Sequence, residues 1–474
     1  MLGVRQGPNG ASHPFDGDVA TLSDRALDLS RATRAASADV YVGSGDTNTW
    51  RTVTSLATAS GRTLEIQDRT GGLYRMNVLD SQGQVEKTVA LNGDVLVRED
   101  ESGNLVVENY VQGDETDGND IIIATSGKAV SGGGGDDQII SLGLGGSPSL
   151  DGTMIDAGDG NDSVFLYGGG RTPVGVETGD GDDRVTVSGG LAIDLDAGSG
   201  DDTVTGTVIY GTIDMGAGDD VVDASYGISA VIDTGDGDDS LRAGYSIGGT
   251  IDTGAGEDEL KSRYEIVGTV STGSGRDRLD AGYNINAVVD TGEGDDVLGA
   301  AYSIGGNIVT GDGNDYLDAG YEIEGHIDTG KGDDFLGAGY QIDGNVQTGD
   351  GGDVLEAGYE MEGTIDTGEG NDFLDAGYQI EAAVDTGAGS DVVRAGYSIS
   401  GDVDTGEGAD VVRSGHEPEG DVDPGDGTAA VVVGRDAERG YYGLLPTPGP
   451  QRFAGAFDGR GATNYRHRRL DIHI

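Results

Sequence analysis

Apolar and polar residues follow a fixed period of 19 residues from Gly216 to Gly427. The copy that begins at Thr234 is TGDGDDSLRAGYSIGGTID, and a threonine recurs every 19 residues as far as Thr405 without an insertion. Numbered from this threonine, leucine or valine fills position 8, isoleucine dominates position 14, and isoleucine or valine fills position 18. Apolar positions of equal parity, with mostly polar residues between them, are typical of β-strands and not of helices. The pattern therefore predicts short strands joined by tight turns.

One such copy is too small to fold alone, because it offers only about three large apolar side chains for burial. Stacked copies would bury those side chains as continuous ladders, and their backbones would pair at about 4.8 Å. A constant period of about 20 residues predicts this arrangement, a solenoid in which each copy forms one coil.

Each copy begins with a turn that is rich in glycine and acid. Glycine occupies positions 2 and 4, and aspartate occupies position 6 in every regular copy. Stacked carboxylates roughly 5 Å apart would repel each other by about 0.8 kcal/mol per pair in water, and more strongly at a protein surface. A bound cation is therefore expected, and calcium fits because it prefers oxygen ligands and glycine lets carbonyl groups converge. An EF-hand lacks support because no helices flank these turns, and a phosphate-binding loop would not carry the aspartate.

The segment TGxGxDxLx closely matches GGxGxDxUx, the calcium-binding nonapeptide of RTX proteins. The repeats thus resemble the RTX (repeats-in-toxin) family, and most closely the 19-residue repeats of RTX adhesins, which include ice-binding regions. The resemblance implies an all-β fold, a right-handed parallel β-roll or β-solenoid of calcium-binding coils. It also implies that the carbonyls of positions 2 and 4 and the carboxylate of position 6 coordinate Ca²⁺ between adjacent turns.

Irregular copies precede the regular block, with aspartates spaced by 25, 21, 19 and 18 residues after Asp137. We expect loops of unequal length there on a similar core, and a metal-free capping turn from Pro424 to Ala429, where the threonine and aspartate are lost. The predicted calcium ligands are an aspartate in the first coil and two glycines with an aspartate in each later coil: Asp120, Gly133, Gly135, Asp137, Gly158, Gly160, Asp162, Gly179, Gly181, Asp183, Gly198, Gly200, Asp202, Gly216, Gly218, Asp220, Gly235, Gly237, Asp239, Gly254, Gly256, Asp258, Gly273, Gly275, Asp277, Gly292, Gly294, Asp296, Gly311, Gly313, Asp315, Gly330, Gly332, Asp334, Gly349, Gly351, Asp353, Gly368, Gly370, Asp372, Gly387, Gly389, Asp391, Gly406, Gly408 and Asp410.

Four regions are expected along the chain. Residues 1–39 are a flexible N-terminus with a short helix, indicated by the spacing of Leu22, Leu27 and Leu29. Residues 40–112 contain the apolar runs TLEIQ, LYRMNVL, VEKTVAL, VLVRE and NLVVENYV between turn signals, which predicts a small antiparallel β domain. This domain would cap the first coil, or else bind a partner. Residues 113–434 are the solenoid, and residues 435–474 are a C-terminal tail.

The composition of the chain excludes some classes of binding partner. The chain of 474 residues has a formal net charge of −58, which argues against nucleic acid and anionic membrane surfaces as partners. It has no cysteine, and no apolar run approaches the roughly 18 residues of a membrane span. The resemblance implies secretion or surface display by a bacterium without a cleaved N-terminal signal peptide. It also implies a C-terminal export signal, which Asp471–Ile474 matches in part and the basic run Arg466–Arg469 does not.

Two further ladders suggest surface roles. Tyrosine recurs at position 12 from Tyr226 to Tyr397, either as a packed aromatic stack or as a binding strip for saccharide or another chain. The threonines at position 1 suggest ice binding as a possible function. Position 3, however, varies from Asp236 to Lys331 and Ala388, and an uneven charged face is poor at ordering water.

We find no convincing set of catalytic residues in the sequence. The five histidines form no HExxH motif, and the GxSxG at Gly244–Gly248 lies inside a repeat without a strand-to-helix turn. The expected function is therefore a calcium-binding repeat protein that folds on binding Ca²⁺, with a structural, adhesive or ligand-binding role. Abundant carboxylates leave a polysaccharide-modifying enzyme of epimerase or lyase type as the alternative, and ice binding as a third.

Overall fold

The computed structural model describes residues 49–69, 73–100, 104–112, 117–125, 127–143, 154–168, 173–189, 192–425 and 430–434. Two compact units are present, one comprising Met1–Asn92 with Glu99–Val106 and the other Gly93–Arg98 with Val107–Ile474. The predicted N-terminal helix and the tail 435–474 lie outside the described residues. No helix long and apolar enough to cross a membrane occurs in the described ranges.

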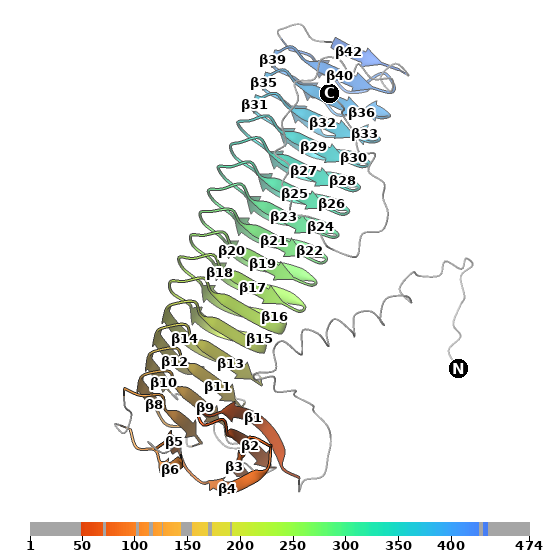
Figure 1. Cartoon of the computed structure of the whole chain (residues 1–474). Helices are drawn as coiled ribbons and strands as arrows, with labels where there is room; N and C mark the ends of the chain where they lie inside the picture. Colours follow the sequence, from red (N-terminus) through yellow and green to blue (C-terminus); the bar gives the residue numbers. More distant parts are fainter. Residues whose placement is uncertain are drawn as a thin grey trace, which may run out of the picture. The chain divides into compact units, whose positions relative to one another are not determined.

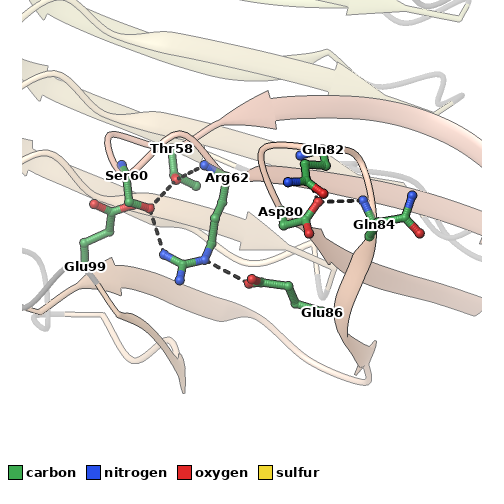
Figure 2. Close-up of polar contacts among 8 residues, drawn as sticks. All are labelled: Thr58, Ser60, Arg62, Asp80, Gln82, Gln84, Glu86 and Glu99. Atoms are coloured by element: carbon green, nitrogen blue, oxygen red, sulfur yellow. Dashed lines mark hydrogen bonds and ion pairs between the residues drawn. The ribbon is translucent and has the colours of Figure 1, made fainter.

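The first unit contains an antiparallel sheet in the order β1-β2-β3-β4. It takes up three of the five predicted apolar runs, TLEIQ, LYRMNVL and VEKTVAL, whereas VLVRE and NLVVENYV lie outside this sheet. Its strands are β1 (Arg51–Ala57), β2 (Thr63–Arg69), β3 (Leu73–Leu79) and β4 (Val85–Leu91). Alternate side chains such as Leu64, Ile66 and Met76 are fully buried on one face. Hydrogen bonds from the backbone of Gln82 and Gln84 to Asp80 hold the turn between β3 and β4, and the Arg62–Glu86 ion pair joins the residue before β2 to β4, on the other side of β3 (Figure 2).

The second unit is a parallel solenoid whose strands follow one another from β7 to β42 (Figure 1). Its first strands are β5 (Val95–Glu99), which extends one residue into the first unit, and β7 (Ile121–Ala124), which pairs with β5 in antiparallel fashion. β6 (Leu105–Asn109) spans the unit boundary. The strands of the irregular coils follow: β8 (Val130–Gly134), β9 (Gln138–Leu142), β10 (Met154–Asp159), β11 (Ser163–Tyr167), β12 (Val174–Asp180), β13 (Arg184–Ser188), β14 (Ala192–Ser199), β15 (Thr203–Asp214) and β16 (Val221–Asp233).

The regular coils each contain a short strand at positions 7–10 and a longer strand at positions 13–19. They are β17 (Ser240–Ala243), β18 (Ser246–Asp252), β19 (Glu259–Ser262), β20 (Glu265–Ser271), β21 (Arg278–Ala281), β22 (Asn284–Asp290), β23 (Val297–Ala300), β24 (Ser303–Val309), β25 (Tyr316–Ala319), β26 (Glu322–Asp328), β27 (Phe335–Ala338), β28 (Gln341–Gln347), β29 (Val354–Ala357) and β30 (Glu360–Asp366).

In the last coils the longer strand is interrupted, and a further short strand forms at positions 3 and 4. These strands are β31 (Glu369–Gly370), β32 (Phe373–Ala376), β33 (Gln379–Ile380), β34 (Ala383–Asp385), β35 (Ala388–Gly389), β36 (Val392–Ala395), β37 (Ser398–Ile399), β38 (Val403–Asp404), β39 (Glu407–Gly408), β40 (Val411–Ser414), β41 (Val422–Asp423) and β42 (Ala430–Val433). β31, β35 and β39 form a separate parallel ladder along the turns.

Every regular coil pairs with the next in parallel register, so equivalent positions stack directly. Leu241 lies opposite Leu260, and Ile251 lies opposite Val270. The side chains at positions 8, 14 and 18 form the core, as in Leu241, Ile247 and Ile251, which are at most 1% exposed. The predicted all-β parallel solenoid with a small antiparallel sheet is therefore confirmed, and so is the alternation of buried and outward positions.

Candidate metal-binding ladder

The aspartates at position 6 form a buried row along one side of the solenoid. All of them, from Asp120 to Asp410, have at most 3% of their surface exposed. Each lies at the end of the glycine-rich turn, immediately before the short strand at positions 7–10, so the stacking of coils also stacks the carboxylates. Buried carboxylates need compensating partners, because a charge removed from water without one is strongly destabilised.

One oxygen of each carboxylate has a structural partner. The backbone N–H of a position-6 aspartate donates to Oδ1 of the equivalent aspartate in the next coil, at 2.8 Å from Asp239 to Asp258 and 2.8 Å from Asp277 to Asp296. The series is continuous from Asp120, which donates to Asp137, to Asp391, which donates to Asp410. These aspartates therefore join neighbouring coils even before a metal is considered.

The other oxygen, Oδ2, has no hydrogen-bond partner in the middle of the row. The threonine hydroxyl at position 1 donates to a carbonyl of the next coil in some of these coils, as from Thr310 to the carbonyl of Thr329 at 3.4 Å, and has no partner within the described ranges at Thr253 and Thr272. The aspartates with a buried and unpartnered Oδ2 are Asp137, Asp162, Asp183, Asp202, Asp220, Asp239, Asp258, Asp277, Asp296, Asp315, Asp334 and Asp353. Leaving a buried polar atom unpaired costs about 1–3 kcal/mol, and more for a charged group. A row of such atoms fits the binding of a cation.

The pKa values of the row show the same deficit of positive charge. Burial raises the pKa of Asp296 from 3.8 to about 6, and the nearby Thr291 hydroxyl and the Asp277 backbone N–H only partly oppose that rise. Burial and the neighbouring carboxylates Asp202 and Asp239 raise the pKa of Asp220 to about 8. Burial likewise raises the pKa of Asp334 to about 8. An adjacent cation would reverse these shifts, because it favours the ionised form.

Glycines at positions 2 and 4 are required by the close approach of one coil to the next. Gly254 has φ +84°, and a Cβ on it would overlap the carbonyl oxygen of Gly235 in the preceding coil. Gly256 has φ +153°, and a Cβ on it would overlap the carbonyl oxygen of Gly237. Both conformations favour glycine. The turn carbonyls consequently lie between successive coils, close to the aspartate row.

The donor set offered by these turns consists of oxygen. The carbonyl of Gly235 accepts a hydrogen bond from the backbone of Ala255 at 3.1 Å, whereas the carbonyl of Gly237 accepts none from the described residues. No group of three or more histidine, cysteine, aspartate or glutamate side chains that could hold a metal occurs in the described part of the chain. The carboxylates alone do not make a site, and the backbone carbonyls of the turns are further oxygen donors beside them. Carboxylate and carbonyl oxygens in this combination suit calcium, and the predicted ligands are chemically compatible with it.

A second polar ladder at position 5 was not identified from the sequence. It lies at the surface beside the buried row, and its hydrogen bonds run in the opposite direction along the solenoid. The backbone N–H of Asp219 donates to Asp201 at 3.0 Å, and that of Asp238 donates to Asp219 at 2.9 Å. The sequence could have predicted this second ladder, because Asp or Asn recurs directly before the invariant aspartate, as in Asp238 and Asn314. Exposed carboxylates in this row add to the negative potential around the turns.

The threonine ladder at position 1 lies inside the solenoid. Thr234, Thr310 and Thr405 are fully buried, as are the equivalent threonines of the other regular coils. These methyl and hydroxyl groups cannot touch a surface such as ice. The buried position of the threonines therefore gives no support to ice binding by this ladder.

The tyrosine ladder at position 12 lies at the surface as a continuous stack. Tyr283, Tyr302 and Tyr321 are separated by ring-centroid distances of 4.9 Å, with interplanar angles of 17° and 10°. Nearly parallel neighbouring rings cover each other's faces, so the exposed part is mainly ring edge and hydroxyl. The predicted aromatic stack is confirmed. Saccharides usually pack on ring faces, and within this stack neighbouring rings cover those faces, as the ring of His416 does at Tyr397.

Comparison with known proteins assigns no family to the chain. No protein-family model matches the chain. No curated protein matches it. Among solved structures the chain is similar to the crystal structure of a hyperactive, Ca²⁺-dependent, β-helical antifreeze protein from an Antarctic bacterium, with 23% sequence identity and a TM-score of 0.44, over 59% of this chain and 84% of that chain. Membership of the RTX family stays a prediction from the repeat motif.

Proposed function

We propose that the solenoid binds a row of Ca²⁺ ions between its coils and that this binding drives its folding. The observation that carries the proposal is the row of twelve buried aspartates whose Oδ2 atoms have no partner. Position-6 carboxylates and turn carbonyls of adjacent coils would hold each ion. When bound, calcium supplies the positive charge that this row lacks and links the two coils that share it.

Folding without the metal is opposed by charge and by composition. The chain has a formal net charge of −58 and 90 glycines among 474 residues. Glycine loses more backbone freedom on folding than other residues, while each regular coil buries only about three large apolar side chains. Stacking the aspartates in register adds a further cost that grows with every coil. Metal binding would offset these terms and become part of the folding free energy.

The biological setting follows from the calcium concentration that such sites need. Extracellular calcium modules typically bind at about 10⁻⁴–10⁻³ M, a range met outside cells but not in a resting cytosol. We therefore propose a secreted or surface protein whose solenoid becomes rigid on export. The resemblance of the repeats to RTX adhesins supports a structural or adhesive role. The antiparallel sheet of the first unit is proposed to serve as the cap of the solenoid.

The test compares the strand signal in far-UV circular dichroism and the hydrodynamic radius of the full chain with calcium, with a chelator, and with sodium chloride at matched ionic strength. We expect compact β structure only with calcium, because salt screens exposed charges but leaves the buried carboxylates unpaired. A magnesium arm tests selectivity, since Mg²⁺ demands a smaller and more regular oxygen shell. A chelated protein that remains compact and rich in strands would refute the proposal. If sodium chloride produced as much compact β structure as calcium, the effect would be general charge screening and not metal binding.

A further inference from the structure

The two ends of the aspartate row differ from its middle. In the first coil, Asp120 is 2% exposed and its carboxylate already has a cationic partner, the guanidinium of Arg98. Nε of Arg98 donates to Oδ1 at 2.9 Å, and Nη2 donates to Oδ2 at 3.2 Å. This two-point contact occupies both oxygens of Asp120, which has no unpartnered oxygen.

Arg98 reaches Asp120 because of the pairing of its strand. β5 runs antiparallel to β7, with Val97 opposite Ile121, so Arg98 follows the paired segment on one strand while Asp120 precedes it on the other. The contact joins residues 22 positions apart and lies entirely within the solenoid unit. A bidentate guanidinium–carboxylate pair is a strong and directional arrangement, and the arginine remains charged at any pH the protein meets.

At the C-terminal end of the row, the hydroxyl of the position-1 threonine donates a hydrogen bond to Oδ2 of the position-6 aspartate in the same coil. Thr367 donates to Oδ2 of Asp372 at 2.6 Å, Thr386 to Asp391 at 2.9 Å, and Thr405 to Asp410 at 3.2 Å. Among the middle coils, Thr291 and Thr310 donate to a backbone carbonyl instead, and the hydroxyls of Thr253 and Thr272 have no partner in the described part of the chain. The change coincides with the three coils in which positions 3 and 4 form the β31-β35-β39 ladder.

We propose that the calcium-dependent part of the row runs from Asp137 to Asp353 and is bounded by two metal-independent ends. Arg98 acts as a tethered cation in place of a metal at Asp120, and threonine hydroxyls satisfy Asp372, Asp391 and Asp410. This inference rests on the proposed function and refines it, because it predicts which coils require the metal. The end coils would then order at lower calcium concentrations and provide the neighbours on which middle coils stack.

Hydrogen exchange of the full chain across a calcium titration tests the first end. In the wild type, we expect amides of Ile121–Ala124 to become protected at several-fold lower calcium than those of Val297–Ala300 in the middle. Arg98→Ala should raise the calcium midpoint of the first segment to that of the middle, while Arg98→Lys should largely preserve it through its charge. Arg394→Ala is the matched control, because it removes an ion pair with Asp375 outside the row.

The second end has its own pair of variants. Thr367→Val frees Oδ2 of Asp372, so amides of Phe373–Ala376 should require more calcium for protection, and equilibrium dialysis should count one more bound ion per chain. Thr310→Val removes a hydroxyl that donates to a carbonyl, so it should change neither quantity. Dialysis that detects no calcium would overturn the proposed function itself. Calcium binding with equal midpoints at the ends and middle of the wild type, or equal effects of the two threonine variants, would overturn only the present inference.

Discussion

The position-6 aspartate serves two roles with its two oxygens. Oδ1 accepts a backbone N–H from the neighbouring coil and helps to fix the register, while Oδ2 in the middle coils has no partner and is available to a metal. A single residue type thus contributes both to the stacking of coils and to the charge that opposes it. Substitutions that separate these roles are therefore more informative than deletion of the side chain.

Asp296→Asn is such a substitution, and we expect its effect on stability to change sign with calcium. The amide oxygen can still accept the hydrogen bond from Asp277, but the buried negative charge is removed. In saturating calcium the variant should lose roughly 1–3 kcal/mol of unfolding free energy, the scale of a hydrogen-bonded charged contact. With chelator near neutral pH it should be more stable than the wild type, because one buried charge fewer remains to be compensated.

Urea denaturation in saturating calcium measures the first effect. The strand signal in far-UV circular dichroism with chelator, where the wild type is expected to be unfolded, measures the second. Asp295→Asn is the matched control, because Asp295 occupies surface position 5 in the same turn and should give small changes of one sign. A variant of Asp296 that is destabilised equally in both conditions would mean that the carboxylate is only structural.

At this scale, the sequence predicted which residues form the row but not how their oxygens are partnered. The period identified the aspartates and glycines because one substitution pattern is repeated in every coil. The Arg98–Asp120 pair was not predictable, since the two residues are brought together by an antiparallel strand pair outside the repeat. The direction of the threonine hydroxyl was also not predictable, because Thr310 and Thr367 occupy identical positions in nearly identical copies.

Among the elements, the turn at positions 11 and 12 carries the tyrosine stack. Its rings repeat with the spacing of the coils, with centroid distances of 4.7–5.2 Å from Tyr226 to Tyr397. The stack ends on His416, whose ring is tilted by 47° relative to that of Tyr397. Because each ring packs against two others, removal of one from the middle breaks two contacts.

Tyr302→Ala should therefore lower the unfolding free energy of the calcium-bound protein by roughly 1–3 kcal/mol, as expected for lost and partly exposed aromatic packing. Tyr302→Phe keeps the ring and should be close to neutral. Thermal or urea unfolding in calcium compares the two variants. If the alanine variant were as stable as the wild type but failed to bind a partner that the wild type binds, the stack would be an interaction surface and not a brace.

The strands of the solenoid were predictable because burial alternates with a period of two in every coil. The sequence also predicted β2 to β6 from apolar runs between turn signals. It did not single out β1, where polar residues such as Thr52 and Ser55 dilute the pattern. Nor did it predict the ladder of β31, β35 and β39, whose two-residue strands depend on the stacking of three successive turns.

For the whole molecule, the raised pKa values of the aspartates couple folding to protons as well as to calcium. Carboxyl groups whose pKa is higher in the folded state bind more protons when folded than when unfolded. The metal-free folded state is consequently most favoured at low pH and loses stability as the pH rises from about 3.8, the ordinary value, through about 6–8, the folded values.

We therefore expect the chelated protein to gain strand signal when the pH is lowered from about 8 to about 5.5, and its affinity for calcium to fall over the same range because protons compete for the same oxygens. Circular dichroism with chelator, paired with calcium titrations at both pH values, measures the two trends. Asp220→Asn and Asp334→Asn remove the groups with the highest pKa values and should weaken the pH dependence. A chelated chain that loses structure on acidification would contradict this account.

The tyrosine stack gives the protein a spectroscopic reporter of its own folding. Ten rings held in nearly the same orientation at a constant spacing place each tyrosine in an equivalent asymmetric environment. Each regular coil that orders should therefore add to the near-ultraviolet circular dichroism of tyrosine. Comparison of this signal with the far-ultraviolet strand signal during a calcium titration would distinguish the ordering of the coils that carry the stack from the ordering of the coils before it.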